Sequence, residues 1–121
     1  MPFVYLTDLK GMENGGSMEW ESPTGEKIVI ARQGETGKVE DFIALSSVCP
    51  HLGCQVHWEP HNDRFFCPCH NGVFTPTGEA IEGPPAMTKP KQRLAQYPLR
   101  IEQGLLFIEV PTETLTLPQE V

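Results

Sequence analysis

Cysteine and histidine side chains are concentrated in two short blocks of the 121-residue chain. Residues 49–54 have the sequence Cys-Pro-His-Leu-Gly-Cys, residues 67–70 have the sequence Cys-Pro-Cys-His, and twelve residues separate the two blocks. The blocks hold all four cysteines and two of the four histidines. Each block has a Cys and a His two or three positions apart, so one tight loop can direct both side chains at one metal. The pattern therefore indicates a metal centre built from two loops.

Three kinds of site are compatible with these six side chains. Two structural disulfides would use the four cysteines, as in many small secreted domains, but would leave the interleaved histidines unexplained. A structural zinc ion would use two thiolates and two imidazoles, and would leave one cysteine in each block idle. A 2Fe-2S centre with two cysteines on one iron and two histidines on the other leaves one cysteine per block free to pair. Only this third kind of site gives all six side chains a role.

The two blocks resemble the signature of the Rieske family, which is Cys-x-His-x-Gly-Cys followed by Cys-x-x-His, often with a third Cys inside the second block. The match holds position for position and implies one Rieske-type 2Fe-2S cluster as cofactor. The resemblance implies that Cys49 and Cys67 bind one iron, and that His51 and His70 bind the other through Nδ1. It also implies a disulfide between Cys54 and Cys69, which would tie the two cluster loops together.

The same resemblance implies an all-β fold of three stacked antiparallel sheets. It extends to the segment that leads into the first block and to Gly83-Pro84-Pro85, which is similar to the proline loop of the family. We find no family signal in residues 1–25 or 111–121. The implied organisation is a single Rieske domain. Its parts would be a cluster-binding subdomain of about 46–88, a base domain of 1–45 and 89–110, and a tail of 111–121.

The elements that must position these loops are short strands. Twelve prolines and eleven glycines punctuate the chain too often for long helices, and the length suits one domain. A hairpin is expected where only Gln103-Gly104 separates two β-branched and aromatic runs. The predicted strands are Phe3 to Leu6, Lys27 to Arg32, Asp41 to Ser46, Arg64 to Cys67, Leu99 to Glu102 and Leu105 to Val110.

Two imidazole ligands make such a cluster easier to reduce than a cluster with four thiolates, because they carry less negative charge. Mild reductants such as quinols are therefore the expected electron donors. An imidazole bound to ferric iron also loses its remaining ring proton more readily, so electron and proton uptake should be coupled. By resemblance to quinol-oxidising relatives, His70 is the expected quinol contact and site of proton-coupled electron transfer.

The loops around the blocks are rich in proline and poor in charge, which predicts a small apolar docking surface at the cluster tip. Leu52 should contact a partner because it lies between residues held by the metal and by the disulfide. Pro84 and Pro85 should contribute to the same surface. The alternative is that these prolines only stiffen the loops.

One departure from the family concerns the reduction potential. The resemblance implies that high-potential members continue the second block with Gly-Ser and place a Tyr two residues later, and that these hydroxyls donate hydrogen bonds to the cluster sulfurs. This chain has Gly72 and Phe74 at those positions. Hydrogen bonds to sulfur stabilise the reduced cluster, so their absence predicts a middling to low potential within the Rieske span, which suits a donor such as menaquinol.

The cysteine pair also bears on function, because quinol-oxidising relatives keep it whereas oxygenase-type and ferredoxin-type relatives generally lack it. The resemblance therefore implies the soluble domain of a quinol-oxidising cytochrome bc-type complex. This domain would pass one electron from quinol to a b- or c-type cytochrome and would not turn over alone. Its place would be the outer, periplasmic-side face of an energy-transducing membrane. The alternatives are a free-standing Rieske ferredoxin in the cytoplasm, serving an oxygenase or reductase, and the small subunit of an arsenite-oxidase-like enzyme.

Charge excludes some partners. A formal charge of -7 argues against nucleic acid or an anionic membrane surface. No apolar run approaches the roughly 20 residues of a membrane span, so membrane contact would need an anchor outside this chain. His57 and His61 are expected to lie at the surface, because strand alternation turns the first outward and the second falls in a turn.

Overall fold

The structure is a computed structural model, and it describes residues 2–50 and 53–111. The described residues form eleven strands and three short 3-10 helices. The strands are β1 (Phe3–Asp8), β2 (Ser17–Glu21), β3 (Lys27–Arg32), β4 (Phe42–Ser46), β5 (His57–Glu59), β6 (Arg64–Cys67), β7 (Gly72–Phe74), β8 (Ala80–Glu82), β9 (Gln96–Tyr97), β10 (Leu99–Glu102) and β11 (Leu105–Glu109). The helices are η1 (Leu9–Gly11), η2 (Val39–Asp41) and η3 (Pro84–Met87). Among the described residues, no helix is long and apolar enough to cross a bilayer.

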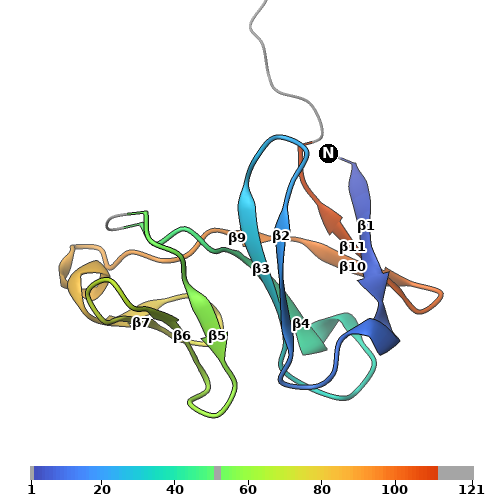
Figure 1. Cartoon of the computed structure of the whole chain (residues 1–121), viewed down its shortest axis with the longest axis horizontal. Helices are drawn as coiled ribbons and strands as arrows, with labels where there is room; N and C mark the ends of the chain where they lie inside the picture. The colour runs from blue at the N-terminus through green and yellow to red at the C-terminus, as the bar shows by residue number, and fades with distance from the viewer. Residues whose placement is uncertain (1, 51–52, 112–121) are drawn as a thin grey trace, which may run out of the picture.

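Three antiparallel sheets account for all of these strands. Their strand orders are β1-β11-β10, β2-β3-β4-β9 and β5-β6-β7-β8. The sheet of β5 to β8 comes from one continuous stretch of chain, whereas the other two sheets take strands from both sides of that stretch. Figure 1 shows the β2-β3-β4-β9 sheet between the other two. The all-β fold with three antiparallel sheets is confirmed.

The middle sheet is buried on both faces, which explains the sequence of β3. In β3, Val29 and Ala31 belong to one core cluster, while Ile28 and Ile30 belong to another. The first cluster includes Phe65 and other residues of the β5–β8 sheet, and the second includes residues of β11. A strand packed on both faces needs a continuous apolar run rather than an alternating one. The central strands therefore hold the two outer layers together.

The strands predicted from the sequence are present, with small differences at their ends. β3, β6 and β10 have the predicted bounds, β4 and β11 are one residue shorter, and β1 is two residues longer. The Gln103-Gly104 turn joins β10 to β11, and both residues have positive φ, as a two-residue hairpin turn requires. β2, whose alternate residues are acidic, was not predicted, and neither were the short strands β7, β8 and β9. For β5, the sequence indicated strand alternation around His57 without defining the bounds of the strand.

A buried carboxylate fixes the connection between β3 and β4. Asp41 is only 4% exposed, and it accepts hydrogen bonds of 2.7 Å from the Thr36 hydroxyl and of 2.7 Å from the Gly37 backbone N–H. Arg32 Nη2 lies 4.0 Å from its second oxygen. Burial raises the pKa of the Asp41 carboxyl, but these hydrogen bonds and the Arg32 charge outweigh burial, so the net pKa lies below its ordinary value.

Two side-chain hydrogen bonds join the middle sheet to the β5–β8 layer. Gln55 Nε2 donates to Glu19 Oε1 on β2 at 2.8 Å, and Gln33 Nε2 donates to the backbone carbonyl of Pro76 at 3.0 Å. The same two layers also share a core cluster. The loops at the edge of the β5–β8 layer are thus held at a fixed position relative to the other two sheets.

Candidate metal centre

The two ends of the first cysteine block are paired with each other. Val48 and Gln55 form an isolated antiparallel bridge, and Cys49 N–H donates to the Cys54 carbonyl at 2.7 Å. Gly53 N–H then donates back to the Cys49 carbonyl at 2.8 Å, and its positive φ of 77° lets the loop close. Cys49 and Cys54 therefore stand opposite each other at the neck of this loop.

The second block is the loop between β6 and β7. Cys67 ends β6 and pairs with Gly72, which begins β7. Only Pro68 to Asn71 lie between them, and the chain reverses through a positive φ of 56° at Asn71. Cys67 is buried at the neck of the loop, while His70 is exposed at its end. One short connection thus provides a buried thiol, as expected of an iron ligand, and an exposed histidine, as expected of a residue that contacts a partner.

The two remaining thiols meet in the interior. Cys49 is 3% exposed and Cys67 is 2% exposed, and both belong to the core cluster that faces the β5–β8 sheet. Burial raises the pKa of the Cys67 thiol, and the Cys49 side chain within hydrogen-bonding reach raises it further. The backbone N–H groups of Cys69 and His70 act in the opposite direction, because they point at the Cys67 sulfur and favour its charged form.

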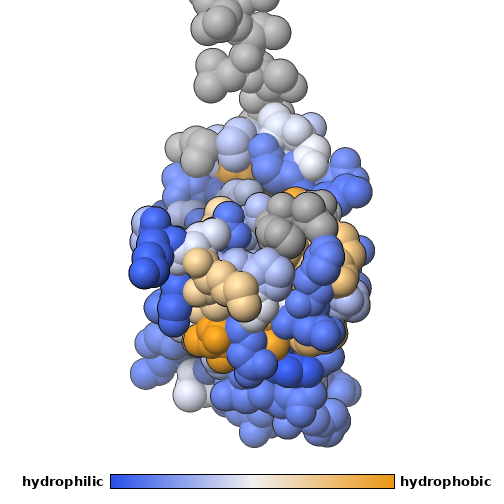
Figure 2. Space-filling view, turned by 90° about the vertical axis from the view of Figure 1, so that its left-hand side faces the viewer, coloured by the Kyte–Doolittle hydropathy of each residue, from blue (hydrophilic) through white to orange (hydrophobic). Residues whose placement is uncertain are grey.

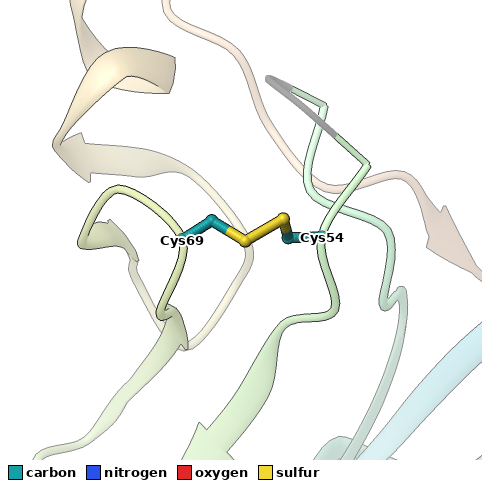
Figure 3. Close-up of a disulfide and its surroundings, with 2 residues drawn as sticks. All are labelled: Cys54 and Cys69. Carbon is teal, nitrogen blue, oxygen red and sulfur yellow. A yellow bond between two sulfur atoms is a disulfide. The ribbon is translucent and has the colours of Figure 1, made fainter.

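The predicted disulfide is present and joins the two loops. Cys54 and Cys69 are bonded, with their Cα atoms 6.4 Å apart (Figure 3). The Cys67 sulfur lies within 4.8 Å of both disulfide sulfurs. Those two sulfurs are not thiolates, so the three sulfurs do not form a three-cysteine metal site. The disulfide instead braces the loops directly beside a free thiol.

A third segment packs on the second loop. η3 lies against β7 and β8, and it follows Gly83, whose φ of 83° and ψ of -174° lie in a region that only glycine adopts readily. A Cβ at Gly83 would lie 2.9 Å from the Gly72 Cα and 3.0 Å from the Asn71 carbonyl oxygen. The absence of a side chain at Gly83 therefore permits the close approach of the proline segment to the second loop.

The residues predicted from the sequence fall into three groups. Cys49 and Cys67 are brought together, and His70 lies on the same loop as Cys67. His51 and Leu52 lie outside the described residues. His57 and His61 are exposed as predicted.

The prediction that Pro85 contributes to a docking surface is wrong. Pro85 is fully buried, because it turns inward against the second loop, and a Cβ on Gly72 would lie 3.6 Å from its Cγ. Pro84 is half-buried. The exposed apolar residues of this segment are Met87, at 80% exposure, and Ile81, at 49%. Figure 2 shows this end of the molecule, where hydrophobic residues form small separate patches among hydrophilic ones.

These donors fit an iron-sulfur centre. Two buried thiols in contact, with backbone N–H groups aimed at one sulfur, are suited to bind metal as thiolates, since metal binding removes their protons and the N–H groups stabilise the resulting charge. A pair of structural disulfides does not fit, because Cys49 and Cys67 are free. The contribution of Gly83 and of the backbone donors was missed in the sequence. The Gly-Pro-Pro tripeptide was the sequence signal that could have revealed the role of Gly83. Backbone N–H donors leave no signal in the sequence.

Comparison with known proteins gives consistent matches. The family model described as the Rieske [2Fe-2S] domain matches residues 4–98, so the family signal reaches into residues 1–25, where we had found none. The cytochrome b6-f complex iron-sulfur subunit of Chlorobaculum tepidum is 33% identical over 85 residues, which are 70% of this chain and 41% of that protein. The menaquinol:cytochrome c reductase iron-sulfur subunit of Bacillus subtilis is 38% identical over 92 residues, which are 74% of this chain and 50% of that protein.

Among solved structures, the plasma membrane Rieske protein PetC3 from Synechocystis PCC 6803 superposes with a TM-score of 0.71 at 25% identity. The match covers 88% of this chain and 99% of that one. The curated relatives are longer, because the matched part of this chain spans only 41% and 50% of the two proteins described above.

Proposed function

The chain belongs to the Rieske [2Fe-2S] family and carries one Rieske-type cluster, and on that premise we propose that it passes single electrons from a quinol to a cytochrome. It would do so as the electron-transfer domain of a cytochrome bc-type complex, at the outer face of an energy-transducing membrane. The cluster, when bound, takes up and releases one electron at a time. The work of the chain is to hold it, to exclude water from it and to contact its partners.

We propose the following roles for the site residues. Cys49 and Cys67 bind one iron from the interior, where burial protects their sulfurs from water. His51 and His70 bind the other iron. His70 Nε2, on the exposed end of its loop, accepts the hydrogen bond and then the proton of a quinol hydroxyl.

The observation that carries the quinol branch of the proposal is the disulfide between Cys54 and Cys69. A bond between the two ligand loops braces a site that must meet partners at its exposed end. The family resemblance implies that quinol-oxidising relatives keep this pair, whereas ferredoxins generally lack it. A persistent disulfide also fits an oxidising compartment, which agrees with the outer face of the membrane.

Low-temperature EPR of the dithionite-reduced protein tests the cluster and its ligands. We expect the spectrum of a 2Fe-2S centre with two histidine ligands on one iron, and an EPR-silent reduced protein would overturn the ligand assignment. Counting alkylatable thiols after denaturation and iron removal, without reductant, should give two. A count of four would favour a ferredoxin.

The donor is tested separately. Oxidised protein mixed with a soluble reduced menaquinone analogue should lose its visible absorbance as it takes up one electron. If dithionite reduces the protein but the quinol does not, the electron-transfer function stands and the quinol branch fails.

A further inference from the structure

We propose that the loop of residues 88–92, which carries Lys89 and Lys91, docks an acidic surface of the protein that exchanges electrons with this chain. This inference rests on the proposed electron-transfer function and deepens it, because it names the charge of the partner and the place where it docks.

The charges of this chain are distributed unevenly. Residues 46–93 contain four acidic and four basic side chains, so the net charge of -7 belongs entirely to the rest of the chain. Within residues 83–93 there are three basic side chains and no acidic one. A local excess of positive charge on a negatively charged protein orients the molecule in the field of an acidic partner.

Lys89 and Lys91 are the cations of this region that remain available. Both are exposed, and among residues 2–50 and 53–111 neither forms an ion pair with a carboxylate. The other two cations of residues 46–93 already have acidic partners. These pairs are Arg64 with Glu59 at 2.8 Å and Arg93 with Glu79 at 4.0 Å.

The loop that carries the lysines is held in place at both ends. The Thr88 hydroxyl lies 3.1 Å from the Pro85 carbonyl oxygen and 2.9 Å from the Pro90 carbonyl oxygen, and can donate to either. Gln92 N–H donates to the same Pro85 carbonyl at 2.9 Å. A loop fixed in this way loses little conformational entropy when a partner binds to it.

Its anchor lies beside the candidate ligand loop. Pro85 is buried against Gly72, which is two residues from His70. Met87, at 80% exposure, immediately precedes the lysine loop. Two cations without a carboxylate partner, in a loop that follows an exposed apolar side chain and is anchored on the second ligand loop, can steer an acidic partner toward this end of the molecule.

A protein surface explains this loop better than an anionic membrane does. Recruitment to anionic lipid takes clusters of about four to eight basic residues, whereas this loop offers two. The remainder of the chain carries the whole net charge of -7 and would be repelled by such a membrane. A small acidic patch on a protein, in contrast, needs to match only the positive charges of this loop.

Paramagnetic broadening by hexacyanochromate(III) tests the docking site without electron transfer. This trianion imitates a cluster of carboxylates, and Met87 and Met18 provide methyl signals at the loop and on β2. In oxidised holoprotein we expect selective broadening of the Met87 methyl signal. The charge reversal K89E/K91E should abolish it. The matched reversal K10E/K38E, which changes the net charge equally but lies in η1 and directly before η2, should leave it.

Electron-transfer rates give the second measurement. Reduced protein passes one electron to hexacyanoferrate(III), giving hexacyanoferrate(II), or one electron to the cationic tris(phenanthroline)cobalt(III), giving its cobalt(II) form. The ratio of the anionic to the cationic rate should fall about tenfold in K89E/K91E at low salt, and much less at high salt. The K10E/K38E variant should change it far less.

Equal broadening in wild type and K89E/K91E, or an unchanged rate ratio, would overturn the proposal. Broadening does not require redox activity. A protein that fails to transfer electrons but shows the predicted broadening would therefore contradict the proposed function, while Lys89 and Lys91 would stand as the site that binds an acidic surface. Cosedimentation with phosphatidylglycerol vesicles that disappears in K89E/K91E would assign the loop to a membrane instead and would also overturn the protein partner.

Discussion

Installing a hydroxyl at Gly72 should raise the midpoint potential of the bound cluster. A Cβ at this position would lie 3.5 Å from the Cys67 Cβ, 3.6 Å from the Pro85 Cγ and 3.7 Å from the Phe74 Cε1. These are ordinary van der Waals distances, so the backbone need not move. Gly72→Ser therefore brings a hydroxyl donor within reach of the Cys67 sulfur in a buried environment.

The size of the effect follows from the strength of such a hydrogen bond. A hydrogen bond to a charged group contributes about 1.5–3 kcal/mol. The sulfur carries negative charge in both redox states, so we take about 1–2 kcal/mol as the part that favours the reduced state. For one electron, about 1.4 kcal/mol corresponds to about 59 mV, which gives a rise of roughly 40–80 mV.

Protein-film voltammetry measures this rise, and Gly72→Ala is the matched control. The alanine fills the same space without a donor, so its midpoint should stay near that of the wild type. Phe74→Tyr adds a second hydroxyl on a fully buried ring and should raise the potential by a similar amount. If serine and alanine give the same midpoint, the reasoning from hydrogen bonding is refuted.

Three further predictions concern stability. Replacing Cys54 and Cys69 by alanine should lower the free energy of unfolding by about 3 kcal/mol in urea titrations, because a 15-residue separation is no longer closed in the unfolded chain; a negligible loss would contradict this. Gly83→Ala should lower the free energy of unfolding by about 1–3 kcal/mol more than Gly25→Ala does. Gly25 also has a positive φ, but a Cβ there would contact nothing within 4 Å, so equal melting temperatures of the two variants would contradict the steric argument. Because the pKa of Asp41 is lowered in the folded state, this carboxylate stabilises the protein fully above its unfolded pKa and progressively less as the pH falls below about 4. In Asp41→Asn the free energy of unfolding should therefore decrease less steeply with falling pH. An unchanged slope in acid unfolding would rule this out.

The residues of the site could be read from the sequence because metal ligation requires particular side chains at particular spacings. That spacing indicated a metal centre, while the family resemblance singled out Cys49 and Cys67 as ligands and Cys54 and Cys69 as a disulfide. The structure shows the disulfide and leaves Cys49 and Cys67 as free, buried thiols. The longer strands were found for a similar local reason, since each carries enough β-branched or aromatic residues to stand out from the surrounding turns.

The contacts between loops could not be read in the same way. Pro85 was assigned to the docking surface because its loop is rich in proline and poor in charge, but the close approach permitted by Gly83 turns it inward. The short strands β7 and β8 were missed because each has only three residues and is specified by pairing with its neighbours rather than by its own composition. Packing between residues distant in the sequence determines both the burial of Pro85 and the formation of the short strands. Local sequence patterns do not contain this information.

Different groups hold the ligand loops in place and control the stability of the reduced cluster. Three features fix the loops: the disulfide, the backbone hydrogen bonds of Cys49 with Gly53 and Cys54, and the packing of Pro85. None of these groups changes its charge when the cluster takes up an electron. Gly72 and Phe74, the positions where the family resemblance implies hydroxyl donors to sulfur, are both buried and have no polar side-chain atoms. Substitution there can change the stability of the reduced state while the loops keep their geometry. We therefore expect the scaffold to permit a range of potentials, and we predict that the lack of hydroxyls places this chain in the lower part of that range.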